Sequence, residues 1–408
     1  MWHMQRRADR QGHEVARLSH GVRKAHVDSP RLYSRCAKCG TVACCGQTFS
    51  PLALALPERT HPQWTWLQSR YASVMSYRLA QIFLRDAFAA GRDRPRPAAT
   101  GRDRPRPASS LKLNVLAVGE KLEREAEHAV ARIARHLPAS RNPVDPRRTP
   151  IALQIDAEYV RAARRPDGAR WIAAVASKVV GPPQAKGCPA HAYATGFNPH
   201  QGVRQQAFLS SVGIPPATPV TVISDGGEDI SFACQLPAAT ERVIDWFHIG
   251  MRFEHLLTAV RGMRDLHQPD KDIVVRRTEG AKWLLWHGQQ ERCLRRRESL
   301  RRDTGWVGPR NPLGRLILYL TGCTSWLINY AKRYAEGRPI SSAGAESAVD
   351  YVVGQRMKRN GHMHWTREGA NAMLQVRCAV LNGQDVRNFK RWYPPAERIN
   401  GLYSRAAA

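Results

Sequence analysis

The chain has 408 residues, 43% of them hydrophobic, which is enough for two or three globular domains. Its 63 Lys and Arg residues outnumber its 34 Asp and Glu residues, and the formal charge is +29. The absence of a long apolar run and of a signal-peptide core argues against a membrane-spanning or secreted protein. We expect a cytoplasmic, nucleoid-associated protein that binds nucleic acid, because so basic a chain repels itself without a polyanion. A basic but otherwise ordinary protein is the alternative.

Four cysteines cluster near the N-terminus, at Cys36, Cys39, Cys44 and Cys45. Four thiolates can bind one Zn²⁺ in a tetrahedral site, and the basic neighbouring residues fit a small DNA-binding knuckle. Adjacent cysteines, as at 44 and 45, rarely both reach one tetrahedral metal ion, so free thiols are the alternative. The five other cysteines are scattered singly and are expected to be reduced and structural.

Helical periodicity appears at about 62–90 and again at about 110–136. Between them the octapeptide GRDRPRPA occurs twice, at 91–98 and 101–108. Alternating proline and arginine favour neither helix nor strand, so this segment is expected to be an extended loop. A passive linker and a contact to the DNA backbone are the two interpretations.

From residue 150 onward the pattern changes to buried strands alternating with helices, which predicts an α/β sheet. The predicted strands lie at 151–156, 171–180, 218–227 and 242–249, and the predicted helices between them at about 200–212 and 251–263. Residues 275–337 are expected to be mostly helical and basic. A last helix is predicted at 341–359, with Ser341 or Ser342 as its cap.

Two lone acids, Asp156 and Asp225, follow apolar strands in this sheet. The carboxyl ends of strands are where α/β sheets hold their sites. Phosphodiester cleavage with two Mg²⁺ ions needs hard carboxylate ligands on rigid elements, and these acids have the right placement. Because Asp-Gly-Gly is also a common turn, structural roles at both positions are the alternative.

A third carboxylate, Glu346, lies in the early turns of the predicted 341–359 helix, with Asp350 one turn later as its rival. A glutamate there is either favoured by the helix dipole or directed at something inside. Helical spacing puts it on the face expected to pack on the sheet, with Val349, Val353 and Met357.

A run of basic residues occurs within the predicted helical region, at Arg295, Arg296, Arg297, Arg301 and Arg302. It is either a solvated helix face or a face that contacts DNA phosphates.

Several blocks of the sequence resemble the transposases of ISKra-type insertion sequences, prokaryotic DDE enzymes that are distantly similar to Mutator-like transposases. The blocks occur in the family's order between about residues 30 and 394 and are CAKCG, FSPLALALPER, LQIDAEYVR, VISDGGEDI, RVIDWFHIGMRFEHL, AGAESAVDYVVGQRMKR, MHWTREGANAMLQVR and FKRWYP. The resemblance implies DNA transposition by an RNase H-like core. It assigns the metal-binding acids to Asp156, Asp225 and Glu346, with Mg²⁺ or Mn²⁺ as a pair of ions.

A second mark of the resemblance is Asp245-Trp-Phe-His248, which is similar to the acid-or-cysteine, two-residue gap, histidine motif of Mutator-like enzymes. His248 is a candidate for contacting the scissile phosphate or orienting a metal-bound water, and Asp245 for orienting His248. A histidine packed at a strand-to-helix junction is the alternative.

The predicted organisation therefore has five parts. They are a basic N-terminal region with a candidate zinc knuckle (1–60), a helical DNA-binding region (61–148), an RNase H-like catalytic core (149–260 and 338–394), a basic helical insertion (261–337) and a tail (395–408). The expected function is metal-dependent cleavage of element ends in double-stranded DNA and strand transfer into target DNA, by a homo-oligomer on DNA. The rivals are an RNase H-like nuclease or resolvase without strand transfer, and a catalytically inactive DNA-binding relic.

Overall fold

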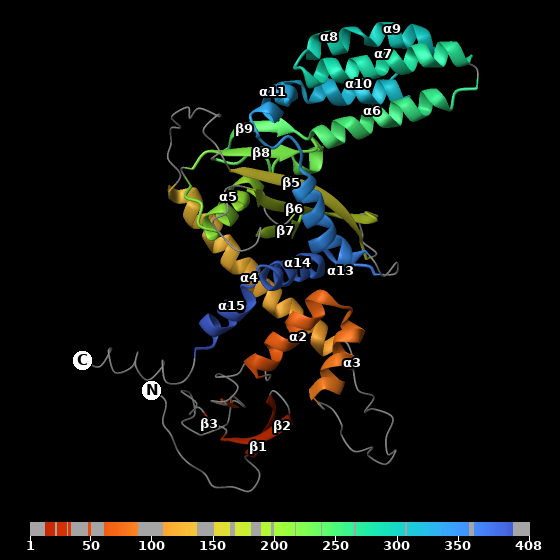
Figure 1. The fold of residues 1–408 in the computed structure, drawn as a ribbon. Coiled ribbons are helices and arrows are strands. Elements are labelled where there is room, and N and C mark those ends of the chain that lie inside the picture. Colours follow the sequence, from red (N-terminus) through yellow and green to blue (C-terminus); the bar gives the residue numbers. More distant parts are fainter. Residues whose placement is uncertain are drawn as a thin grey trace, which may run out of the picture. The chain divides into compact units, whose positions relative to one another are not determined.

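The computed structural model describes the strand residues 13–20, 23–30, 32–33 and 48–49, and then residues 61–88, 109–136, 151–163, 168–180, 189–196, 200–216, 218–237, 239–264, 267–306, 308–358 and 363–394. Figure 1 shows these parts as a ribbon. The chain forms two compact units, Met1–Gly119 with Gly383–Ala408, and Glu120–Asn382. The cluster of Cys36, Cys39, Cys44 and Cys45 and the repeat at 91–108 lie outside the described residues.

The smaller unit contains short antiparallel strand pairs and helices. The strands are β1 (His13–His20), β2 (Arg23–Pro30), β3 (Leu32–Tyr33) and β4 (Thr48–Phe49), and the helices are α2 (Pro62–Val74), α3 (Tyr77–Phe88), the first part of α4 (Ser109–His136) and α15 (Asp385–Trp392). Helix α15 is fixed to α2 by the buried carboxylate of Asp385, which accepts hydrogen bonds from Trp66 Nε1 and Arg70 Nη1, both at 2.9 Å. The rings of Tyr71 and Phe83 pack α2 on α3.

A five-stranded mixed sheet forms the centre of the larger unit (Figure 1). Its strands are β5 (Ala152–Arg161), β6 (Trp171–Val180), β7 (Ala190–Ala194), β8 (Val220–Ser224) and β9 (Ala239–Ile244), in the spatial order β7-β6-β5-β8-β9. The first three strands are antiparallel, whereas β8 runs parallel to β5 and β9 runs parallel to β8. The predicted α/β class is thus confirmed. Strand β7, which the sequence analysis did not predict, consists mainly of small residues with little β propensity.

Alternation along β5 separates the two faces of the sheet. Leu153 and Ile155 point into an apolar core that includes Phe208 and Leu209 of α5 (Gln201–Ser211). Asp156 has the opposite parity and therefore lies on the other face. That face is covered by α12 (Ala343–Val349), which packs on β5 and β6.

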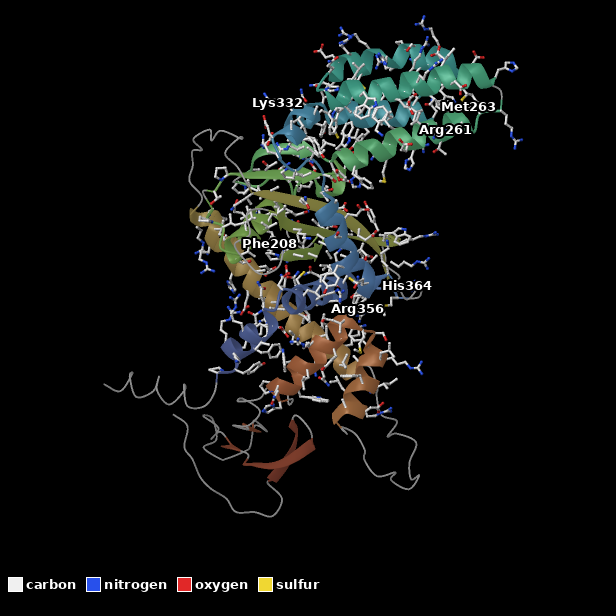
Figure 2. All side chains as sticks on the ribbon, in the orientation of Figure 1. Phe208, Arg261, Met263, Lys332, Arg356 and His364 are labelled. Carbon is white, nitrogen blue, oxygen red and sulfur yellow. The ribbon has the colours of Figure 1, made fainter. Side chains whose placement is uncertain are left out.

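A helical insertion separates β9 from α12. It consists of α6 (Trp246–Arg261), α7 (Gln268–Trp286), α8 (Gln290–Arg295), α9 (Arg297–Thr304), α10 (Pro312–Gly322), a 3-10 turn (Thr324–Trp326) and α11 (Tyr330–Ala335). Helix α6 leads away from the sheet to Arg261, and the helices that follow pack beside it in a bundle (Figures 1 and 2). Apolar side chains from these helices share one core with Ile223, Val243 and Ile244 at the edge of the sheet.

The helix predicted at 341–359 is confirmed between Ala343 and Met357, but it is interrupted. Helix α12 is followed by one π-helical turn (Asp350–Gly354) and then by α13 (Gln355–Met357). Such a turn is typically a single insertion within an α-helix and often occurs at functional sites. Helix α14 (Arg367–Leu381) then packs on β7. No helix among the described residues is long and apolar enough to cross a membrane.

Candidate metal centre

The two predicted strand acids lie at the same edge of the parallel pair β5–β8. Asp156 does not end its strand as predicted, because β5 continues to Arg161 along its antiparallel partner β6. The parallel pairing with β8 does stop here, since its last pair is Ile155 with Ser224. Asp156 and Asp225 are therefore the first residues beyond that pair on each strand.

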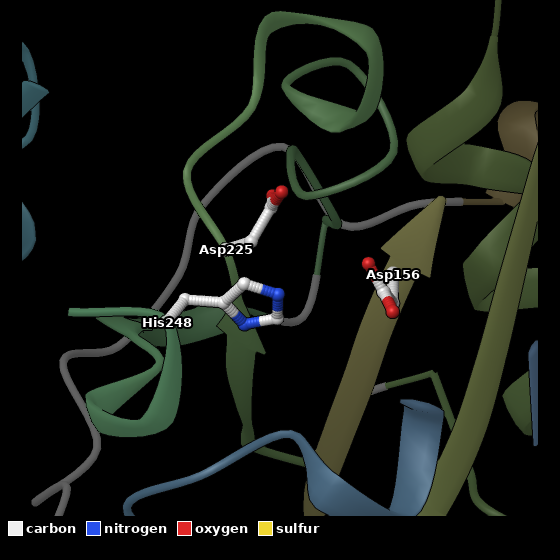
Figure 3. A group of neighbouring side chains, drawn as sticks. All are labelled: Asp156, Asp225 and His248. Atoms are coloured by element: carbon white, nitrogen blue, oxygen red, sulfur yellow. The ribbon is translucent and has the colours of Figure 1, made fainter. Parts of the chain in front are cut away.

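Three side chains converge at this edge, from β5, from the end of β8 and from the first turn of α6 (Figure 3). Asp156, Asp225 and His248 each offer one ligand atom, and these atoms lie within 4.8 Å of one another. Asp156 is buried, and the other two are half-buried. Two carboxylates and an imidazole at this spacing can hold a divalent metal ion.

The turn after β8 fixes the position of Asp225. Its side-chain Oδ1 accepts a hydrogen bond from the backbone N–H of Gly227 at 2.8 Å, and its carbonyl oxygen accepts one from the Tyr319 hydroxyl at 2.7 Å. Gly226 has a φ of +80°, and a Cβ there would lie 2.7 Å from Cys323 Sγ. Asp-Gly-Gly is thus a turn, as the structural alternative held, and that turn also holds the carboxylate at the site.

The environment of Asp156 disfavours its charged form. Its pKa is raised to about 6: burial is the largest cause, and repulsion from Asp225 and Glu346 adds to it, whereas a hydrogen bond from the Ala157 N–H acts to lower it. His248 acts in the opposite direction. An acid held in this way gains from any nearby cation, so the electrostatics agree with a cation site.

Glu346 belongs to this electrostatic neighbourhood, but its side chain is exposed. The expectation that it would pack on the sheet with Val349, Val353 and Met357 is wrong. Those three are buried, whereas Glu346 lies exposed in the first turn of α12. The charges of Asp225 and Glu346 both raise the pKa of Asp156.

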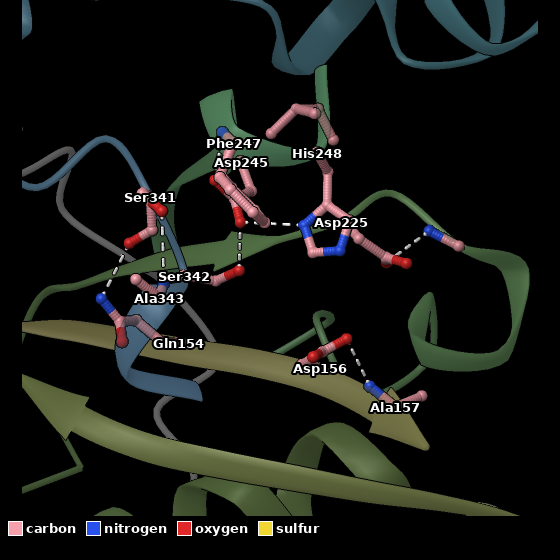
Figure 4. A network of polar contacts seen from close by, with 12 residues as sticks. Gln154, Asp156, Ala157, Asp225, Asp245, Phe247, His248, Ser341, Ser342 and Ala343 are labelled. Atoms are coloured by element: carbon pink, nitrogen blue, oxygen red, sulfur yellow. Dashed lines mark hydrogen bonds and ion pairs between the residues drawn. The ribbon is translucent and has the colours of Figure 1, made fainter. Parts of the chain in front are cut away.

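His248 is held by a hydrogen-bond network that begins at Asp245 (Figure 4). The predicted strand at 242–249 is wrong at its end, because β9 stops at Ile244 and Asp245 caps α6 by accepting the Phe247 N–H at 2.7 Å. The other carboxylate oxygen, Oδ2, lies 2.9 Å from His248 Nδ1 and accepts the Ser342 hydroxyl. The network therefore leaves Nε2 of His248 for the site.

Both partners in this network are stabilised in their charged forms. Burial acts to raise the pKa of Asp245, but the hydrogen bonds from His248, Ser342 and the Phe247 N–H outweigh it, so the pKa is lowered. The hydrogen bond to Asp245 raises the pKa of His248, against the opposing effect of burial, and the charges of Asp156 and Asp225 add to the rise. The pair can thus present an imidazolium beside two carboxylates.

The sequence analysis missed the residues that connect α12 to this network. Ser342 occupies the predicted cap position, but its hydroxyl donates to Asp245 rather than capping the helix. Ser341 accepts the Ala343 N–H on its hydroxyl, and its carbonyl oxygen accepts Gln154 Nε2 at 2.8 Å (Figure 4). No local pattern signals such contacts, because they join residues far apart in the chain.

The other predicted site residues lie elsewhere. Cys36, Cys39, Cys44 and Cys45 are outside the described residues, so the zinc site stays a prediction. The predicted basic residues Arg295, Arg296, Arg297, Arg301 and Arg302 lie on α8, α9 and their junction, in the helical insertion. Four of the single cysteines are free and buried, as expected: Cys234, Cys293, Cys323 and Cys378.

The chain was compared with protein-family models, with curated proteins and with solved structures, and none of the three comparisons gave a significant match.

Proposed function

We propose that this protein is a DDE transposase that cleaves the DNA ends of an insertion sequence and joins them to target DNA. The observation that carries the proposal is the convergence of Asp156, Asp225 and His248 within 4.8 Å, with Glu346 close enough to act on Asp156. These are the residues that the resemblance to ISKra-type transposases assigns to chemistry. The net charge of +29 supports a polyanionic substrate.

The fold supports the same proposal. The sheet order β7-β6-β5-β8-β9, with three antiparallel strands followed by two parallel ones, agrees with an RNase H-like core. In such a core the first and fourth strands of the sheet are neighbours, and here β5 and β8 carry Asp156 and Asp225. The helical insertion would then interrupt the core between Asp225 and Glu346.

The donor set fits Mg²⁺ or Mn²⁺. Asp156 and Asp225 supply the hard oxygen ligands that these ions prefer, and Glu346 is the third carboxylate of the proposed set. When bound, a pair of such ions stabilises charge on the phosphoryl oxygens and activates a water or a 3′-hydroxyl.

His248 has a separate role in this proposal. Its Nδ1 is engaged by Asp245, and its raised pKa favours an imidazolium that donates through Nε2. A donor in that position can bind a non-bridging oxygen of the scissile phosphate and orient the substrate. Asp245 and Ser342 act as positioning residues because they fix the imidazole ring.

The test is cleavage of a DNA duplex carrying the element end, with Mg²⁺ or Mn²⁺, by Asp225→Asn beside the unaltered protein. The substitution keeps the size of the side chain but removes a charged ligand. Cleavage should fall by at least about 100-fold, since metal activation contributes several kcal/mol to the transition state. Duplex binding should stay the same or tighten, because a negative charge near the phosphates is gone.

Three outcomes separate the proposal from its rivals. Cleavage followed by joining to a second duplex supports a transposase. Cleavage that never proceeds to joining, under conditions that support strand transfer, would favour a nuclease or resolvase. DNA binding with no cleavage by the unaltered protein would identify an inactive DNA-binding relic.

A further inference from the structure

The helical insertion has an open pocket where α7 meets the junction of α8 and α9. It is lined by Ile273, Arg276, Arg277, Arg296 and Ser299, and its volume is about 490 Å³. Three arginines and one serine, from two segments of the chain, therefore line a single hollow. A pocket with this lining suits an oxygen-rich anion, because guanidinium groups match phosphate in geometry and charge.

The charge of the pocket is only partly neutralised. Arg277 pairs with Asp303, which is the one carboxylate paired with these three arginines among the described residues. Arg276 is exposed and Arg296 is half-buried. The pocket therefore keeps a positive excess that an anion from outside can neutralise.

The arginines of the run predicted from the sequence lie on different surfaces of the structure. Arg297 and Arg301 both contact the carboxylate of Glu298 on the exposed face of α9, at 3.3 and 3.6 Å. Arg296 instead lines the pocket beside α7. Of the five arginines in the run, one faces the pocket, and its basic partners Arg276 and Arg277 come from a helix about twenty residues earlier in the chain.

Gly280 provides the space for Arg296. A Cβ at residue 280 would lie 2.3 Å from Nη1 of Arg296, so the guanidinium lies against the backbone of α7 there. Glycine inside a helix costs up to about 1 kcal/mol relative to alanine. The 19-residue helix α7 is therefore less stable with glycine than with alanine at position 280, but the glycine lets the Arg296 guanidinium lie close to the helix backbone.

An exposed aromatic ring continues the same face of α7. Trp283 follows Arg276 by seven residues, which is two helical turns, and its exposed fraction is 56%. Clustered basic side chains on one helix face are typical of surfaces that bind nucleic acid, and the Trp283 ring extends that face.

From these observations we infer that the pocket of Arg276, Arg277 and Arg296 binds a backbone phosphate of duplex DNA. The choice of DNA as the partner rests on the proposed function. The contact is to the backbone, so it positions the duplex without reading its sequence. Arg296 and Arg276 are direct donors to the phosphate, and Gly280 is a positioning residue that keeps Arg296 in place.

The first experiment measures duplex affinity by fluorescence anisotropy over a range of salt concentrations, with the full-length protein. Arg276→Gln and Arg296→Gln should each weaken binding equally on unrelated DNA sequences. Each should also lower the slope of log K against log salt concentration by about 0.9, the value for one lost phosphate contact. The control is Arg292→Gln, which removes the same charge from an exposed α8 residue outside the pocket.

The second experiment uses Gly280→Ala, which keeps every charge. Alanine favours the helix, so loss of fold does not account for weaker binding. The variant should nevertheless shift the Arg296 guanidinium and lose part of the affinity that Arg296→Gln loses, since only the movable end of that side chain meets the new Cβ, and the double variant should bind like Arg296→Gln.

If the pocket variants bind like Arg292→Gln, the inference is overturned. Gly280→Ala that binds like the unaltered protein would overturn the positioning role of Gly280. Either failure leaves the proposed function standing, because the cleavage test on Asp225→Asn does not involve the pocket. Loss of cleavage with normal duplex binding in the pocket variants would also overturn the inference.

Discussion

Ser342 donates a hydrogen bond to the carboxylate of Asp245, although 97 residues and the whole helical insertion separate the two in the chain. Asp245 begins α6, by which the chain enters the insertion, and Ser342 directly precedes α12, at which the insertion has ended. The same carboxylate oxygen holds His248. The orientation of His248 therefore depends on both ends of the insertion.

Ser342→Ala should lower DNA cleavage by roughly tenfold, because Asp245 loses one of the bonds that fix it against His248. The substitution also leaves a buried carboxylate with one partner fewer, at a cost of about 1–3 kcal/mol in stability. Ser342→Thr keeps the hydroxyl and should recover most of the activity. The measurement is cleavage rate against pH, together with the melting temperature.

The matched control for this prediction is Ser341→Ala, since the Ser341 hydroxyl only accepts the Ala343 N–H at 3.2 Å. A structural effect alone would change stability without moving the pH profile. If Ser342→Ala changes stability but leaves both rate and pH profile as in the unaltered protein, Ser342 does not position His248.

Asp156→Asn should stabilise the metal-free protein at neutral pH. Burial and neighbouring acids raise the folded-state pKa of Asp156 to about 6, above its usual value. The folded protein thus binds this proton more tightly than the unfolded chain, so stability is lost as pH rises from about 4 to about 6. Asparagine cannot ionise and can still accept the Ala157 N–H, and at pH 7 it should add about 1–3 kcal/mol.

The measurement is thermal unfolding in a chelator at several pH values. The gain in melting temperature should be a few degrees at pH 7 and should disappear near pH 4, where both proteins are neutral at residue 156. A gain that is independent of pH, or a loss at pH 7, would show that the charge of Asp156 is not strained in the folded state.

Mn²⁺ or Mg²⁺ should raise the melting temperature of the unaltered protein. An ion present at 100 times its Kd stabilises the folded state by about 2.7 kcal/mol. Asp156→Asn and Asp225→Asn should abolish the shift, whereas Glu228→Gln, an exposed acid three residues after Asp225, should retain it. His248→Ala should also retain most of it, because the proposal has the imidazole contact phosphate. If His248→Ala also abolished the shift in melting temperature, His248 would be a metal ligand and not a phosphate contact.

Glu346→Gln should reduce cleavage by at least about 100-fold, whereas Asp350→Asn should stay within roughly threefold of the unaltered protein. The reason is that Glu346 lies close enough to raise the pKa of Asp156, whereas Oδ1 of Asp350 lies beside the backbone of Gly354. The measurement is single-turnover cleavage with duplex binding as the control. If Asp350→Asn reduced cleavage more than Glu346→Gln did, Asp350 and not Glu346 would be the third metal-binding carboxylate.

The sequence was sufficient for the parts of the fold that depend on local pattern. The apolar runs before Asp156 and Asp225 predicted buried strands, and the position of these acids predicted a site at the carboxyl ends of those strands. The helical register after α12 could not be predicted in this way. A π-helical turn has the same composition as an α-helix, so the turn at Asp350–Gly354 gives no signal in the sequence.

The residues that orient the site were beyond sequence reasoning for another reason. Ser342 looked like a helix cap, and only tertiary contact makes it a donor to Asp245. The phosphate pocket is similar, because the arginine run drew attention to α8 and α9 while Arg276 and Arg277 lie on α7. Local pattern identifies which side chains are charged, and packing decides which of them face one another.

The two ends of the helical insertion are joined directly, since the N–H of Trp246 donates to the carbonyl oxygen of Ile340 at 3.0 Å. A segment whose entry and exit touch can be lengthened, shortened or exchanged without changing the path of the strands that it interrupts. Changes to the bundle, and under the proposed function to its contacts with a duplex, can therefore accumulate while the acids on β5 and β8 stay where they are. The same exchange could be made experimentally by grafting another helical bundle between Trp246 and Ile340. The graft would have to preserve the hydrogen bond between Ser342 and Asp245, which joins the two ends of the insertion.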